Sequence, residues 1–214
     1  LILSLYLRLL LLHLDHGTDK ALIIEAVNRG FKSVMIDASS DPFDENVRRT
    51  KEIVEYAHLR GIVVEAEIGH VGVGEAYKSK ENSDSIYTTV EEAKKFVELT
   101  EVDSLAISIG TAHGVYKGIP VINFERLKEI RDAIDTPLVL HGGSSSGDDN
   151  LGRCAADGIS KINIYTDLVN AAYNKAKDTK WEDYYELRTA QIEGMKECLE
   201  HYYGVFQTKK YRLG

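Results

Sequence analysis

The sequence predicts an α/β fold in which short, buried parallel strands alternate with amphipathic helices. Six runs of consecutive apolar residues, several of them rich in β-branched side chains, are typical of strands buried on both faces of a sheet. They lie at residues 9–14, 33–36, 62–68, 104–109, 137–140 and 159–164. Alternating units of this kind imply right-handed crossovers and one parallel sheet, and we expect a single domain over residues 1–214.

Boundary residues mark the helices between these strands. Gly30, Gly61 and Gly158 follow amphipathic stretches and are typical helix stops. Thr-Thr-Val-Glu-Glu at residues 88–92 has the pattern of a capping box. We therefore expect helices at residues 18–28, 44–59, 88–99, 124–134 and 148–156, and a long C-terminal helix at about 181–203.

Polar side chains lie at the end of almost every predicted strand, and this distinguishes two arrangements of a parallel sheet. A (β/α)8 TIM barrel gathers all its strand ends at one mouth, where the active site lies. An open doubly wound sheet uses only its switch point. The polar strand ends are Asp15, His16, Asp37, Glu67, His113, His141 and Asn163. Because so many strand ends carry such side chains, the barrel is favoured.

The composition argues against several classes of function. With 34 acidic and 26 basic residues, the net charge is −8, so the chain lacks the basic footprint that nucleic acid or an anionic membrane requires. The apolar stretch at residues 1–12 is too short to span a bilayer. The 2 cysteines, Cys154 and Cys198, form no disulfide framework, which suits a reducing cytoplasm. We expect a cytoplasmic protein that binds neither nucleic acid nor membrane.

Three histidines from three different strand ends form the strongest candidate site. His16, His113 and His141 are each followed by glycine and would converge at the mouth of a barrel. Three imidazoles with an open fourth position are the ligand set of a catalytic zinc site. The alternative is that each is an isolated polar residue near a loop. His13 is expected to be structural and His58 to lie on the surface.

Seven stretches, in order along the chain, resemble the class II, metal-dependent ketose-bisphosphate aldolases, the family of fructose- and tagatose-bisphosphate aldolases. They are Leu12-His-Leu-Asp-His-Gly17, Gly30-Phe-Lys-Ser-Val-Met-Ile-Asp37, Pro42-Phe-Asp-Glu-Asn46, Val64-Glu-Ala-Glu-Ile-Gly69, Ile109-Gly-Thr-Ala-His-Gly-Val-Tyr-Lys-Gly118, Leu138-Val-Leu-His-Gly-Gly-Ser144 and Ser160-Lys-Ile-Asn163. Each stretch alone is weak, but seven in the family's order are specific.

The resemblance implies roles for the acidic residues. It makes His16, His113 and His141 zinc ligands and Asp15 the catalytic aspartate, although Asp15 next to a ligand is also a candidate orienter of that ligand. Glu67 matches an acidic strand end near the metal and is a further candidate ligand, or else a buried ion-pair partner. Residues 69–87 are long and polar enough for a mobile loop. Within this loop, Glu75 matches the family's catalytic base, and a solvated loop glutamate is the alternative.

Small and polar residues at three strand ends are candidates for binding phosphate. In barrels of this kind, the loops after strands seven and eight commonly bind phosphate through backbone N–H groups. The candidates are Gly142, Gly143 and Ser144 in one loop, Asn163, Tyr165 and Thr166 in the next, and Gly114 and Lys117 after the strand before them. Lys117 would supply a point charge.

The predicted reaction is reversible aldol cleavage of fructose or tagatose 1,6-bisphosphate into dihydroxyacetone phosphate and glyceraldehyde 3-phosphate. The implied cofactor is Zn²⁺, with a monovalent cation as a further candidate, and we expect a homodimer or homotetramer. Two alternatives are a non-catalytic sugar-phosphate-binding protein and a zinc barrel hydrolase. Because six strands match strands three to eight of the aldolase barrel, we expect the first two βα units to be missing from this chain.

Overall fold

Six parallel strands form one curled sheet in the computed structural model, which describes residues 11–69, 87–111 and 120–208. Hydrogen bonding follows the chain order β1-β2-β3-β4-β5-β6, and every neighbouring pair is parallel. The strands are β1 (His13–Gly17), β2 (Ser33–Ile36), β3 (Val63–Ile68), β4 (Ser104–Ile107), β5 (Leu138–Leu140) and β6 (Ile159–Ile162). The predicted α/β fold with a parallel sheet is therefore confirmed.

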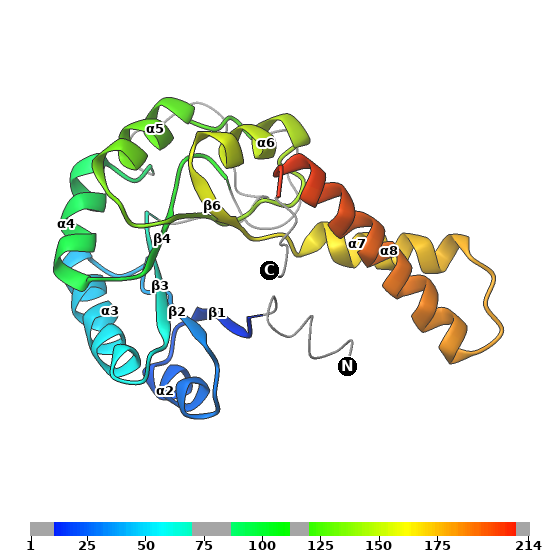
Figure 1. The fold of residues 1–214 in the computed structure, drawn as a ribbon, viewed down its shortest axis with the longest axis horizontal. Coiled ribbons are helices and arrows are strands. Elements are labelled where there is room, and N and C mark those ends of the chain that lie inside the picture. The colour runs from blue at the N-terminus through cyan, green and yellow to red at the C-terminus, as the bar shows by residue number, and fades with distance from the viewer. Residues whose placement is uncertain (1–10, 70–86, 112–119, 209–214) are drawn as a thin grey trace, which may run out of the picture.

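Five helices cover the outer, convex side of the sheet (Figure 1). They are α2 (Lys20–Asn28), α3 (Phe43–His58), α4 (Val90–Thr100), α5 (Phe124–Ala133) and α6 (Asp148–Asp157). Their apolar faces pack against the strands to form one core, in which Ile23, Phe96 and Leu127 are fully buried. The side chains that alternate with the core residues of the strands point to the inner, concave side of the sheet, and they include Met35, Glu65, Glu67, Ala106 and Val139.

The sheet curls far enough to bring its two outer strands into contact through their side chains. Asn163, just after β6, donates a hydrogen bond from Nδ2 to Oδ1 of Asp15 in β1, at 3.0 Å. Among the described residues, β1 and β6 do not pair through their backbones. The structure thus shows a curled six-stranded half-barrel, and a complete eight-stranded barrel stays a prediction.

The helices expected from the sequence are confirmed, with ends that lie within three residues of the predicted ones. Thr89 accepts a hydrogen bond from the backbone of Glu92, and the Glu92 side chain reaches back to Thr89, so both halves of the capping box form. Helices α2, α3 and α6 end at or just before Gly30, Gly61 and Gly158, which have φ values of +96°, +65° and +126°.

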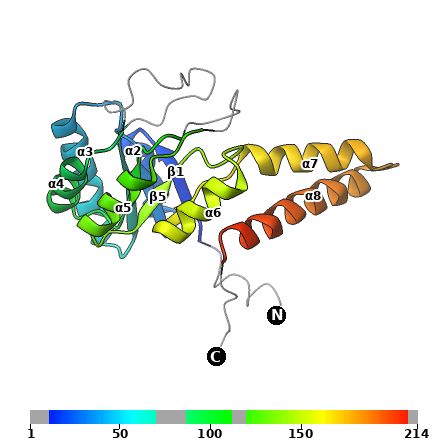
Figure 2. The same ribbon diagram turned by 90° about the horizontal axis from the view of Figure 1, so that it is seen from above.

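The long C-terminal helix predicted at about 181–203 is confirmed at 184–205, and a helix that was not predicted precedes it. Two antiparallel helices, α7 (Thr166–Asp178) and α8 (Tyr184–Val205), form a hairpin that projects from the half-barrel (Figure 2). Helix α7 was not predicted although its sequence is amphipathic, and the side chains that it buries, Ala172 and Ala176, are small. Gly194 lets α8 approach α7 closely, since a Cβ there would strike the carbonyl oxygen of Ala171.

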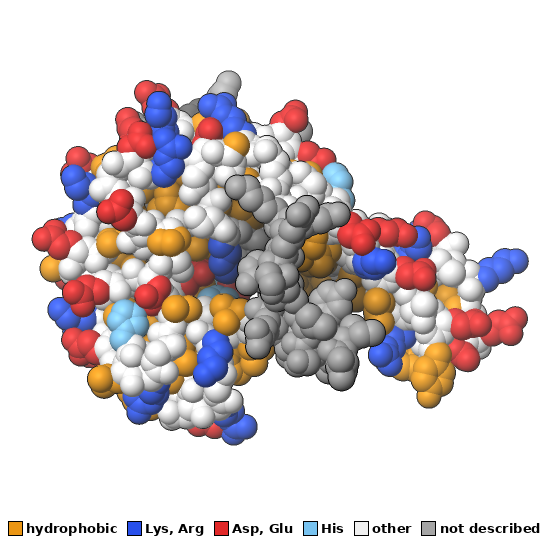
Figure 3. Space-filling model, in the orientation of Figure 1, with side chains coloured by type: hydrophobic (Ala, Val, Ile, Leu, Met, Phe, Trp, Pro, Cys, Tyr) orange, Lys and Arg blue, Asp and Glu red, His pale blue; other side chains and the backbone are white. Residues whose placement is uncertain are grey.

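Acidic and basic side chains are intermixed over the face seen in Figure 3, with no concentrated basic patch there. None of the helices in the described part of the chain has both the length and the apolar character needed to cross a membrane.

Substituting Gly143 with alanine is expected to destabilise the fold by about 1–3 kcal/mol, since an added Cβ overpacks a tight contact. The Cβ would lie 2.8 Å from side-chain atoms of both Ile162 and Ile164 and 2.9 Å from the carbonyl oxygen of Asn163. Gly204→Ala is the control, because nothing lies within 4 Å of its added Cβ. Denaturant unfolding followed by circular dichroism measures both. Equal stability of Gly143→Ala and the native chain would contradict this account.

Candidate metal and catalytic site

A bulge in β1 presents two consecutive side chains to the interior of the half-barrel. Successive residues of a regular strand point to opposite faces. Here the pairing of β1 with β2 shifts register between Leu14 and Gly17, and His16 has a φ of +48°. Its backbone N–H donates to the Met35 sulfur at 3.3 Å. A bulge of this kind re-aims a side chain. Asp15 and His16 can therefore both face the same site.

His16 is held from behind by a carboxylate on the neighbouring strand end. Its Nδ1 lies 2.8 Å from Oδ2 of Asp37, and this hydrogen bond raises the pKa of His16. Burial alone would raise the pKa of Asp37, but hydrogen bonds from His16 and Ser39 outweigh burial and hold that pKa well below its usual range. Asp37 is therefore an ionised acceptor that fixes the orientation of the His16 ring.

His141 has the same arrangement, deeper in the molecule. It follows β5, its side chain is fully buried, and its Nε2 lies 2.8 Å from Oε1 of Glu65 in β3. Burial disfavours the ionised form of Glu65, but the hydrogen bond from His141 and the charge of Lys161 lower its pKa overall. A buried ionised carboxylate of this kind accepts a hydrogen bond from the ring N–H and thereby fixes the orientation of the His141 ring.

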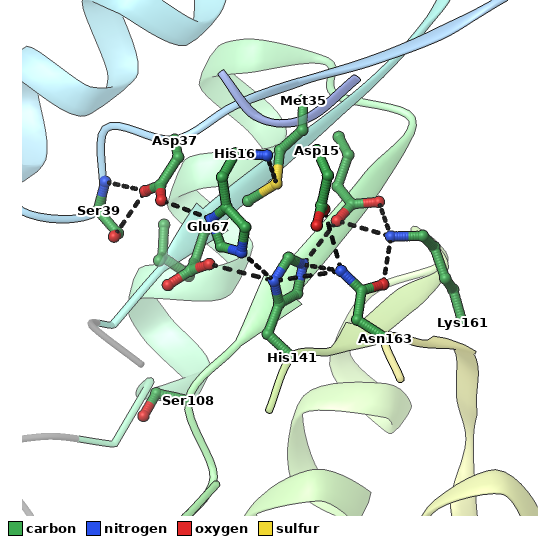
Figure 4. Close-up of polar contacts among 12 residues, drawn as sticks. Asp15, His16, Met35, Asp37, Ser39, Glu67, Ser108, His141, Lys161 and Asn163 are labelled. Atoms are coloured by element: carbon green, nitrogen blue, oxygen red, sulfur yellow. Dashed lines mark hydrogen bonds and ion pairs between the residues drawn. The ribbon is translucent and has the colours of Figure 1, made fainter. Parts of the chain in front are cut away.

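The remaining nitrogens of the two rings point at each other. Nε2 of His16 and Nδ1 of His141 lie 2.8 Å apart (Figure 4). Because Asp37 and Glu65 can only accept, the outer nitrogens carry the hydrogens, and the two inner nitrogens face each other. The inner nitrogens would hold a divalent cation, with each outer ring nitrogen donating to a carboxylate. This is the usual support of histidine ligands, so the donor set fits a metal such as Zn²⁺.

Glu67 borders this pair of histidines. Its Oε2 lies 3.9 Å from Nδ1 of His141, and its side chain is 2% exposed. One ligand atom each from Glu67, His16 and Asp37 lie within 4.8 Å of one another, as do those of Asp15, His16 and His141. Carboxylate oxygens from either side are thus available next to the two imidazoles.

Asp15 is linked to the opposite edge of the sheet. Its Oδ1 accepts from Nδ2 of Asn163 at 3.0 Å, and Oδ1 of Asn163 accepts from Nζ of Lys161 in β6 at 2.7 Å. The Asp15 side chain is 51% exposed, so it faces the open interior next to His16. The predicted site residues Asp15, His16, His141 and Asn163 are therefore brought together.

The loops after β5 and β6 lie side by side, as the phosphate prediction requires, but several of their polar groups bind each other. The Ser144 hydroxyl accepts from the backbone N–H groups of Tyr165 and Asp167, at 3.1 and 3.3 Å. The backbone N–H of Ser145 donates to the Asp167 carboxylate at 2.8 Å. Ser144 thus caps the start of α7, where Thr166 is the first helical residue and Tyr165 is 77% exposed.

Four predicted site residues, His113, Gly114, Lys117 and Glu75, lie outside the described residues. Three other histidines lie among the described residues. His13 hydrogen-bonds the Ser33 hydroxyl at 2.7 Å, consistent with a structural role. His58 and His201 are exposed on helices and pair with Asp103 and Asp148.

Sequence reasoning missed Glu65 and Lys161, and it gave Asp37 no role. A usable signal exists for the first two. Glu65 precedes Glu67 by two residues, and Lys161 precedes Asn163 by two, so each shares a strand face with a candidate site residue. A charged side chain on the inner face of a buried strand requires a partner, and that partner lies in the site.

A curled parallel sheet that gathers histidines and carboxylates at the carboxyl ends of its strands defines a barrel-type α/β protein with a candidate metal centre. The chain belongs to the class-II fructose-bisphosphate aldolase family, whose model matches residues 8–210. It is 43% identical over 185 residues to YdjI, an uncharacterized protein of Escherichia coli K12, which amounts to 86% of this chain and 66% of YdjI. The chain thus spans about two thirds of that relative's length.

Solved structures agree with this assignment. The crystal structure of the YdjI aldolase from Escherichia coli K12 matches with a TM-score of 0.79 and 39% identity, over 91% of this chain and 68% of that one. A candidate fructose-1,6-bisphosphate aldolase from Coccidioides immitis matches with a TM-score of 0.79 and 31% identity, over 91% and 70%. The fructose-bisphosphate aldolase of Campylobacter jejuni, at 24% identity and a TM-score of 0.72 over 92% and 70%, shows the fold alone.

Proposed function

We propose that this protein is a metal-dependent lyase that reversibly cleaves a ketose 1,6-bisphosphate, fructose or tagatose, into dihydroxyacetone phosphate and glyceraldehyde 3-phosphate. The observation that carries the proposal is the pair of facing imidazoles, His16 and His141, each supported by a carboxylate and bordered by Asp15. Family membership supports the same reaction class.

We propose Zn²⁺ as the metal, held by His16, His141 and His113, with Glu67 as a further ligand. When bound, the metal would act as a Lewis acid on the substrate carbonyl and offset the negative charge that develops there. A monovalent cation stays a prediction. His16 and His141 contribute by presenting neutral nitrogens on rings whose outer N–H groups are fixed by Asp37 and Glu65.

Proton transfer falls to two carboxylates. Asp15 lies next to His16, faces the open interior and is oriented by Asn163, so we assign it the proton of the aldehyde oxygen. Glu75, by resemblance to the family, would remove and return the carbon-bound proton. Because Asp15 and Glu75 act on different protons, each carboxylate can lie next to the atom that gains or loses its proton.

The phosphate groups would be bound where loops of small residues meet a helix start. Gly142, Gly143 and Ser144 lie against the N-terminus of α7, with Asn163, Tyr165 and Thr166 in the adjoining loop. Gly114 and Lys117 are assigned to the same task by resemblance. Asp167 already occupies the N–H of Ser145, so we assign phosphate binding to other N–H groups of this region.

Three further expectations belong to this proposal. The six described strands would correspond to strands three to eight of an eight-stranded barrel. The assembly would be a homodimer or homotetramer. The protein would work in the cytoplasm on a small sugar bisphosphate.

Removing the metal is expected to lower cleavage by about a thousandfold or more, since Lewis-acid stabilisation is worth several kcal/mol. The experiment treats the purified protein with EDTA, verifies metal removal, and assays triose phosphate release from both ketose bisphosphates. Zn²⁺ or Co²⁺ should restore turnover, and EDTA saturated with Zn²⁺ beforehand is the control. Unchanged cleavage by verified metal-free protein would refute the proposal.

The same preparation separates the two alternatives. A zinc hydrolase would release no triose phosphate from either ketose bisphosphate yet would cleave another bond in a metal-dependent way. A non-catalytic binding protein would bind sugar bisphosphate in calorimetry without turnover.

A further inference from the structure

Lys161 is a charged side chain on the inner face of β6. It contacts two residues, Glu65 and Asn163, each of which contacts a candidate site residue. Its Nζ lies 3.0 Å from Oε2 and 3.2 Å from Oε1 of Glu65, and 2.7 Å from Oδ1 of Asn163 (Figure 4). The Lys161 side chain is 38% exposed, whereas that of Glu65 is 2% exposed. The ammonium group thus lies between the deep interior and the open mouth.

The contact with Asn163 connects Lys161 to Asp15. A lysine ammonium only donates hydrogen bonds, so it requires the oxygen of the Asn163 amide on its side. The amide nitrogen is thereby directed at the Asp15 carboxylate, which only accepts, at 3.0 Å. Lys161 therefore determines which end of Asn163 reaches Asp15.

The contact with Glu65 connects Lys161 to His141. Oε1 of Glu65 accepts from both Lys161 and Nε2 of His141, at 3.2 and 2.8 Å. A single buried carboxylate oxygen is shared between the ammonium and the candidate metal ligand. Lys161 thus limits how much negative charge Glu65 presents to the His141 ring and fixes where Glu65 sits.

We infer that Lys161 is a positioning residue that sets Asp15 through Asn163 and His141 through Glu65, so that one ammonium group aligns the proton-transfer carboxylate with the metal ligand. This inference rests on the proposed function. The competing explanation is that Lys161 only neutralises the buried Glu65 carboxylate, in which case its removal would change stability alone.

The test replaces Lys161 with methionine, which is unbranched and only one atom shorter and removes the charge. We expect Lys161→Met to lower kcat about 10- to 100-fold, the usual effect of removing a group behind a ligand, with KM changed less than about threefold. Combined with Asn163→Ala, the loss should be much smaller than the product of the two single losses, because Lys161 acts through Asn163. The matched control is Lys175→Met, which breaks a Lys–Glu pair of 2.7 Å between α7 and α8.

Several results would overturn the inference. A native value of kcat in Lys161→Met would show that Lys161 serves only as the ion-pair partner of Glu65. If the kcat losses of the two single variants multiply fully in the double variant, action through Asn163 is excluded. If Lys161→Met fails to fold, Lys161→Arg takes its place, since it keeps the charge opposite Glu65 but has a fixed planar geometry. Lys161→Arg is then expected to melt like the native chain with kcat lowered severalfold, and native kcat would contradict the inference.

A cobalt measurement separates failure of this inference from failure of the proposed function. The visible absorption of bound Co²⁺ reports the geometry of its ligands and requires no turnover. We expect Lys161→Met to change that spectrum, because Glu65 behind His141 loses the ammonium group that helps to hold it, whereas Lys175→Met leaves it unchanged. If the native protein cleaves neither ketose bisphosphate, the proposed function fails, but the cobalt spectrum still tests the positioning role. A cobalt spectrum of Lys161→Met that is identical to the native one would overturn that role.

Discussion

Replacing His141 with alanine is expected to reduce metal affinity and cleavage by more than about a hundredfold. Removing a group that merely orients a ligand costs roughly 10- to 100-fold, so removing the ligand itself costs more. His141 is fully buried and supplies one of the two facing nitrogens, 2.8 Å from Nε2 of His16. Metal content by atomic emission and triose phosphate release measure the two effects.

The matched control for this substitution is His201→Ala. His201 also pairs with a carboxylate, Asp148, at 3.0 Å, but it is exposed on α8. Because His141→Ala leaves the buried Glu65 with one partner fewer, we expect a lower melting temperature, and His141→Gln repeats the test with a side chain that fills more of the space. A folded variant that retains one tightly bound metal ion per chain would show that His141 is not a ligand.

The order of strands and helices could be predicted because each element carries its own local signal. Apolar runs marked five of the strands, β1 (His13–Gly17) shares only residues 13 and 14 with its predicted run, and Thr89 with Glu92 marked the start of α4. Helix α7 was missed although its sequence is amphipathic, because it buries only Ala172 and Ala176 and packs on α8 where Gly194 meets Ala171. Contacts between distant segments do not appear in a local pattern.

The site residues likewise divide into those that a local sequence pattern reveals and those that depend on contacts between strands. Asp15, His16, His141 and Asn163 could be found from their place after predicted strands, and the structure brings them together. The bulge that turns His16 inward could not be found, because it depends on how β1 pairs with β2. Glu65 and Lys161 were missed because their role consists of contacts with other strands.

The paired carboxylates suggest why the site uses two different supports for its histidines. Asp37 is partly buried, with 19% of its side chain exposed, and is held ionised by Ser39 as well as His16. Glu65 is buried and is held ionised by Lys161. Each carboxylate therefore has a second donor, so neither depends on the metal-site histidine alone to stay charged.

Asp15→Asn is expected to lower kcat for cleavage about 10²- to 10⁴-fold, the usual contribution of a positioned acid or base. The replacement has the same shape, and its amide oxygen can still accept from Nδ2 of Asn163, now 3.0 Å from Oδ1 of Asp15. Metal content should stay native, because the histidines are untouched. The loss would therefore report proton transfer rather than a collapsed site.

A partial reaction identifies which proton Asp15 moves. Dihydroxyacetone phosphate in D₂O exchanges its carbon-bound hydrogen when the base that we assign to Glu75 acts, and proton NMR follows this exchange. We expect Asp15→Asn to keep exchange within about tenfold of native while cleavage is lost, since the oxygen-bound proton is needed only when the carbon–carbon bond breaks or forms. Asp132→Asn, at a side chain of similar exposure (55% against 51%), is the control. Equal loss of exchange and cleavage would place Asp15 on the carbon-bound proton or on the metal instead.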